Sequence, residues 1–150
     1  MQRSITHKKP IELFTAIAFF VLYSSLCSIY PILPPMLAVL FVLFTNALTR
    51  EDYFSVLLIS LCLVVFEANN GYILFSTIIY FYFIYKVIIP KIRQNFSCFS
   101  CIIIANVFLA YIGYFLFLTL ISSIFLLEAP QLNYYIVYYI VIEFLVVSLI

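Results

Sequence analysis

Glu143 is the one ionisable residue that lies deep inside an apolar run of this sequence. Burying a carboxylate near the centre of a bilayer costs at least about 2.5–3.5 kcal/mol, so such a residue usually has a partner or a function. Counted from the inner end of its helix, Glu143 lies roughly 10 Å deep at 1.5 Å per residue, and Asn106 lies at a similar depth in the preceding helix. We therefore expect a hydrogen bond between Glu143 and Asn106. The pair is either a clamp that locks two helices together or a site for a proton or a substrate.

A second polar group ends an earlier apolar run, in the sequence Glu67-Ala-Asn69-Asn70-Gly71. Asparagine and glycine are typical turn residues, and Gly71 can adopt a positive φ at no steric cost. One interpretation of this corner is a solvated turn with an acidic anchor. The other is a docking point for a partner protein.

The pair Cys98-Phe-Ser-Cys101 has the spacing that elsewhere indicates redox or metal chemistry. A zinc site needs further ligands, but no second cysteine pair follows and His7 is the only histidine. We expect small structural residues here or, if the protein is eukaryotic, thiols that accept a palmitoyl chain beside the basic Lys91 and Arg93. No other pattern indicates a nucleophile and its base, a phosphate-binding loop or a metal cluster, so neither an enzyme nor a cofactor is expected.

The composition places most of this chain in lipid. Hydrophobic residues make up 67% of the sequence and charged residues 9%, whereas soluble domains carry roughly 25% charged residues. A helix needs about 20 apolar residues to cross a bilayer, with a range of roughly 17 to 25. We predict one all-α membrane domain with six transmembrane helices, at about 11–30, 34–49, 53–67, 72–89, 98–127 and 134–150.

The second and third of these segments are short, so they either cross a thinned bilayer or form a re-entrant hairpin. The basic residues favour two crossings. They fall in three clusters, at the N-terminus, after the second segment and after the fourth, and six crossings place all three on one side. Basic residues gather on the cytoplasmic side of membrane proteins, so both termini are expected there. The residues are Arg3, Lys8, Lys9, Arg50, Lys86, Lys91 and Arg93.

The stretch from Tyr30 to Tyr85 resembles the MreD family of rod-shape-determining proteins of the bacterial inner membrane. The likeness lies in Tyr30-Pro-Ile-Leu-Pro-Pro-Met-Leu-Ala-Val-Leu-Phe41, in a short polar turn, and in an apolar helix that closes with Glu67-Ala-Asn-Asn-Gly71. The overall length and the predicted number of helices also agree. The resemblance implies a six-helix bundle similar to the substrate-binding component of vitamin transporters.

The resemblance also implies a function and a set of partners. It indicates a non-enzymatic scaffold in the bacterial cytoplasmic membrane that binds a bitopic protein like MreC. Through that protein the chain would join a glycosyltransferase, a transpeptidase and the MreB filament. Membrane lipid surrounds the chain, and no nucleic acid is expected among its partners. The alternative is a substrate-binding subunit of a small-molecule transporter, which needs a cavity lined by convergent polar groups.

Overall fold

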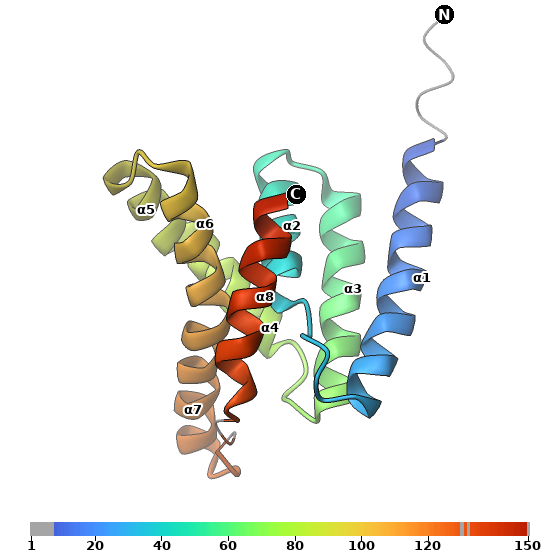
Figure 1. Cartoon of the computed structure of the whole chain (residues 1–150), viewed down its shortest axis with the longest axis vertical. Coiled ribbons are helices and arrows are strands. Elements are labelled where there is room, and N and C mark those ends of the chain that lie inside the picture. The colour runs from blue at the N-terminus through green and yellow to red at the C-terminus, as the bar shows by residue number, and fades with distance from the viewer. Residues whose placement is uncertain (1–7, 130, 132, 150) are drawn as a thin grey trace, which may run out of the picture.

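The computed structural model describes residues 8–129, 131 and 133–149, and of residues 8–10 it describes the backbone alone. Every element in this part of the chain is helical (Figure 1), as the sequence predicts. The elements are α1 (Lys8–Ile29), α2 (Leu37–Thr49), α3 (Tyr53–Asn70), α4 (Ser76–Phe83), η1 (Ile84–Ile88), α5 (Ile89–Asn95), α6 (Phe99–Phe108), η2 (Leu109–Gly113), α7 (Tyr114–Phe125) and α8 (Tyr135–Leu149).

Three helical segments are long and apolar enough to cross a membrane: Ile11–Ile29, Tyr53–Asn70 and Phe99–Phe125. Two further apolar helices, Leu37–Thr49 and Tyr135–Leu149, are shorter. These lengths and compositions indicate a membrane protein. The number of crossings stays a prediction.

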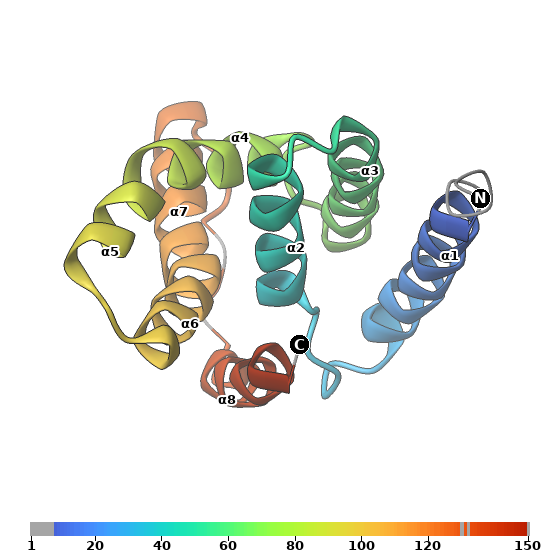
Figure 2. The same ribbon diagram turned by 90° about the horizontal axis from the view of Figure 1, so that it is seen from above.

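The helices form an open bundle in which successive helical runs alternate in direction (Figure 1). The beginning of α1, the turn between α2 and α3, the helix α5 and the end of α8 all lie at one end of the bundle. Seen from that end, α2 lies in the middle and α1 stands apart at the edge (Figure 2). The central helix α2 contacts α3, α4, α6, η2 and α8, whereas α1 packs mainly against α3.

Several helix boundaries differ from the predicted ones for local backbone reasons. α2 begins at Leu37 rather than at residue 34, because each proline of the preceding pair keeps the residue before it out of the helical region. Its N-cap residue Met36 has a left-handed backbone with φ 54°. α3 continues past Glu67 to Asn70, where Gly71 ends the helix with φ 68°. The positive φ predicted for Gly71 is therefore confirmed, and it is the usual conformation after a helix end.

The predicted end of the fourth segment, before Pro90, is wrong. The helical run starts at Ser76, after Phe75 with φ 67°, and continues through η1 and Pro90 to Asn95. η1 is a π-helical turn, and such turns are common causes of helix bends. Pro90 directly follows this π-helical turn, which changes the register of the backbone hydrogen bonds just where the proline N–H is missing.

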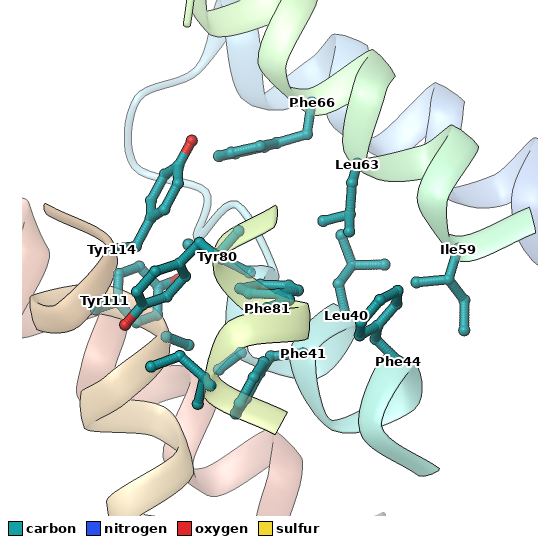
Figure 3. Close-up of a cluster of buried hydrophobic side chains, with 14 of the residues drawn as sticks. Leu40, Phe41, Phe44, Ile59, Leu63, Phe66, Tyr80, Phe81, Tyr111 and Tyr114 are labelled. Atoms are coloured by element: carbon teal, nitrogen blue, oxygen red, sulfur yellow. The ribbon is translucent and has the colours of Figure 1, made fainter. Parts of the chain in front are cut away.

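The core is a cluster of aromatic and aliphatic side chains from α2, α3, α4 and η2–α7 (Figure 3). The Phe41 and Phe81 rings meet edge to face with centroids 4.8 Å apart, and the Phe44 ring lies 6.0 Å from Phe81. Such aromatic pairs add about 0.5–1.5 kcal/mol beyond the burial of area. The core thus holds α2 in a fixed position between its neighbours.

Candidate functional site

Glu143 lies in α8 with none of its surface exposed, and it binds the beginning of α2. One carboxylate oxygen accepts the backbone N–H of Leu37 at 3.0 Å, and the other accepts that of Ala38 at 2.6 Å. The Tyr111 hydroxyl in η2 donates a third hydrogen bond to the same carboxylate. The first N–H groups of a helix have no partner within the helix, and the helix dipole favours a negative charge there. Glu143 is therefore a remote cap that joins α2, η2 and α8.

The predicted bond between Glu143 and Asn106 is wrong, because the carboxylate bonds to Leu37, Ala38 and Tyr111 instead. Asn106 is half-buried in α6, which does pack against α8. Counting residues along two helices placed both side chains at a similar depth. The depth count did not show that α2 begins inside the bundle. There the N–H groups of Leu37 and Ala38 are buried and need an acceptor, and the Glu143 carboxylate serves them instead of Asn106.

Glu67 does the same for α4. It is fully buried near the end of α3, and it accepts the backbone N–H of Phe75 at 2.6 Å and of Thr77 at 2.5 Å. The Ser76 hydroxyl donates a further bond at 3.1 Å. Around this cap, the Thr77 hydroxyl donates to the hydroxyl of Tyr114 at 2.9 Å. Two helices of this chain thus begin at a carboxylate supplied by a different helix.

The corner formed by residues 67–71 is therefore divided in the structure. Glu67 points into the bundle, so it is neither a solvated acidic anchor nor available to a docking partner, and both interpretations are wrong for this residue. Asn69 donates its amide hydrogen bond to the Ser24 hydroxyl at 3.0 Å, so it ties α3 to α1. Asn70 donates to the carbonyl oxygen of Phe66 at 2.8 Å. Gly71 is exposed and ends α3.

A sequence signal for both caps exists, although the sequence interpretation did not use it. Met36 and Phe75 precede α2 and α4, and neither side chain can accept a hydrogen bond from the helix. Ser, Thr, Asp and Asn are the residues that cap helices locally. A buried helix start without such a residue needs an acceptor from elsewhere, and Glu67 and Glu143 are acidic residues within apolar runs.

Two cavities flank this framework. The larger, of about 510 Å³, lies between α1, α2 and α3 and has mainly apolar walls. The smaller, of about 290 Å³, lies near the opposite end of the bundle and mixes polar with aromatic side chains. Its polar lining residues are Ser24, Ser28, Asn70, Gln131 and Asn133, and its tyrosines are Tyr72, Tyr111, Tyr114 and Tyr139.

The remaining predicted residues that the structure describes lie toward the bundle end that holds the start of α1. Arg50 lies at the turn between α2 and α3, Lys86 in η1, and Lys91 and Arg93 in α5. Arg3 and the side chains of Lys8 and Lys9 lie outside the described part. Cys98 is exposed at the start of α6, and Cys101 is partly exposed in its first turn. Within the described residues no group of three or more metal-binding side chains converges.

Comparison with known proteins adds no relative to this picture, since no family model, curated protein or solved structure matches the chain.

Proposed function

We propose that this chain is a non-enzymatic scaffold subunit that binds the transmembrane helix of a single-span partner on the outer face of α1. In this proposal it crosses the bacterial inner membrane six times with both termini in the cytoplasm. Following the resemblance to MreD, the partner is a protein like MreC, and the assembly is the cell-elongation complex with its glycosyltransferase, its transpeptidase and MreB. The observation that carries the proposal is the sparse packing of α1.

α1 is far less covered by its own bundle than the other long helices. Only 6% of the Ile11–Ile29 segment is buried, compared with 22% of Tyr53–Asn70 and 28% of Phe99–Phe125. Apolar area facing lipid gains little by association, so helices in membranes associate through close packing of complementary faces. A helix that its own bundle leaves largely uncovered has a full face available for such packing.

The outer face of α1 has the spacing of a helix-packing surface. Six of its exposed residues recur at intervals of three and four positions, as one stripe of a helix does, and further exposed residues such as Phe19 and Leu26 lie beside this stripe. Two small residues, Ala18 and Ser25, lie among the large ones of this stripe, which lets a partner backbone approach closely. The stripe consists of Ile11, Phe14, Ala18, Leu22, Ser25 and Ile29.

The segment that resembles MreD has a specific structural role. Its prolines lead to the buried start of α2, and its acidic residue Glu67 caps α4. Both features position helices inside the bundle, as expected of a segment that defines a fold. The bundle end that holds Arg50, Lys91 and Arg93 also holds the first residues of α1 and the last of α8 (Figure 1). This supports the proposed orientation, because basic residues favour the cytoplasmic side.

Photocross-linking tests the partner surface. A photoreactive amino acid at Phe14 or Leu22 of α1 is compared with the same probe at Leu116 or Leu120 of α7. The controls are matched, because these α7 residues are also exposed and apolar. We expect the α1 probes alone to cross-link a single-span protein, with a reciprocal cross-link from its transmembrane helix back to α1. Equal cross-linking from both helices, or to lipid only, contradicts the proposal.

Cysteine labelling tests the topology. Single cysteines replace Asp52 and Asn70 in a chain without its four native cysteines, and a membrane-impermeant maleimide is added to intact cells. We expect labelling of the Asn70 position from outside and of the Asp52 position only after permeabilisation. Labelling of both positions from the same side refutes the six crossings.

A second function is favoured by the smaller cavity. Its mixture of amide, hydroxyl and tyrosine groups suits a neutral small molecule, as in the binding subunit of a transporter. Purification in mild detergent separates the two functions. A bound small molecule, or an ATPase pair that copurifies, favours the transporter, whereas a single-span coiled-coil protein with cell-wall enzymes favours the scaffold.

A further inference from the structure

The larger cavity is a groove along α2, and its two ends differ in chemistry. Its walls are apolar side chains of α1, α2 and α3, among them Leu13, Ile17, Phe20, Leu43, Leu58 and Ile59. At the end near the turn between α2 and α3, the lining becomes polar with Asn46, Arg50, Asp52 and Ser55. An apolar groove with a charged mouth has the polarity of a lipid molecule.

The length of the groove matches one leaflet of a bilayer. Its lining extends along α1 from Leu13 to Tyr23, roughly 15 Å, and along α2 from Met36 to Ala47, roughly 16 Å, at 1.5 Å per residue. The hydrocarbon core of a bilayer is about 30 Å thick, so the chains of one leaflet span about 15 Å. A volume of about 510 Å³ is typical of a small-molecule site.

The mouth carries one charge of each sign. Arg50 and Asp52 both line it and both are exposed. The Ser55 hydroxyl donates a hydrogen bond of 2.8 Å to the Asp52 carboxylate, which holds the carboxylate at the first turn of α3. A guanidinium group binds phosphate in a two-pronged geometry, and a carboxylate accepts hydrogen bonds from an ammonium group.

We propose that this groove binds one phospholipid with a phosphoethanolamine headgroup, its phosphate at Arg50 and its primary ammonium at Asp52. One acyl chain lies along α2 between α1 and α3, and the other stays in the surrounding bilayer. A purely anionic headgroup leaves the carboxylate of Asp52 beside a phosphate without a cation. A quaternary ammonium headgroup has no N–H to donate. The site is distinct from the outer face of α1, so it does not depend on the scaffold function.

Native mass spectrometry of the purified full chain tests the site. The protein is titrated with phosphatidylethanolamine, phosphatidylcholine and phosphatidylglycerol of the same acyl chains. An exposed ion pair contributes about 0.2–1 kcal/mol, which corresponds to a change in affinity of up to about fivefold. We expect phosphatidylethanolamine to be retained about threefold better than the other two lipids. Arg50→Gln should lower its retention about threefold, and Asp52→Asn should abolish the preference over phosphatidylglycerol.

Two further variants locate the lipid. Ala16 lines the groove from α1 and is exposed, so Ala16→Leu and Ala16→Phe fill the groove without disturbing the packed core. Both should reduce the binding of all three lipids, the larger side chain more. Glu51→Gln is the matched control, because this charge lies in the same turn but does not line the groove. Equal retention of the three lipids, an Arg50→Gln effect no larger than that of Glu51→Gln, or unchanged binding in both Ala16 variants overturns the proposal.

Discussion

Replacing Glu143 by leucine should destabilise the protein by removing the acceptor for three hydrogen bonds. The N–H groups of Leu37 and Ala38 and the hydroxyl of Tyr111 would then lie buried without a partner. A buried donor left unsatisfied costs about 1–3 kcal/mol, and hydrogen bonds between helices of membrane proteins average about 0.6 kcal/mol. With about 1 kcal/mol for each of the two N–H groups and about 0.6 kcal/mol for the hydroxyl, we expect Glu143→Leu to lower the free energy of unfolding by about 2.6 kcal/mol.

The pattern across four variants identifies the partners of Glu143. Glu143→Leu should cost the most, and Glu143→Gln less, because the amide keeps one carbonyl oxygen but turns an NH₂ group toward a donor. Tyr111→Phe should cost about 0.6 kcal/mol, since it removes one hydroxyl. Asn106→Ala, the matched control, should stay within about 0.5 kcal/mol of the wild type.

Thermal unfolding in mild detergent, followed by loss of the monodisperse peak in size-exclusion chromatography, provides the measurement. A chain of 150 residues shifts its melting temperature by about 2–4 °C per kcal/mol. Glu143→Leu should therefore melt about 5–10 °C lower than the wild type. If Asn106→Ala melts as low as Glu143→Gln while Tyr111→Phe is unchanged, the capping argument is refuted and the pair expected from helix depth is restored.

Two other substitutions test the buried contacts of α4 by the same melting assay. Glu67→Leu removes the acceptor at the start of α4 and should lower the free energy of unfolding by about 2 kcal/mol. The control Glu128→Leu, at an exposed acidic residue outside the helices, should leave the melting temperature nearly unchanged. Equal shifts of the melting temperature in the two variants would contradict the capping role of Glu67. Gly113→Ala should cost about 1–3 kcal/mol by overpacking, because its Cβ would lie 1.9 Å from the Tyr80 hydroxyl oxygen. In a Tyr80→Phe background the same change should cost less, and an unchanged cost would show that the hydroxyl is not the obstacle.

The helical segments were predictable because their signals are local. Six apolar runs separated by proline, glycine, asparagine and charged residues predict helices wherever the backbone must satisfy its own hydrogen bonds in lipid. Gly71 behaved as expected, because a positive φ after a helix depends on its own lack of a side chain. Pro90 did not, because its effect depends on the π turn before it, and such a turn has no strong local signal.

The site was less predictable, because its contacts join residues distant in the sequence. Glu143 lies more than 100 residues from the N–H groups that it caps. The sequence singled out both buried carboxylates, since an acidic residue in an apolar run is costly and therefore informative. It could not name their partners, because backbone N–H groups are present at every residue and only the folded chain shows which of them are left unpaired.

The sequence by itself thus indicated a lipid environment, the all-helical class and the grouping of basic residues, all of which follow from composition and local pattern. The tertiary structure alone decided that α2 and α4 begin inside the protein at carboxylates from other helices. It also decided that α1 stands apart, with an apolar groove at its inner face that has a charged mouth. The physical reason is that hydrogen-bond pairing and the shape of a cavity are properties of helices packed together, and neither is encoded in the apolar character of a single run.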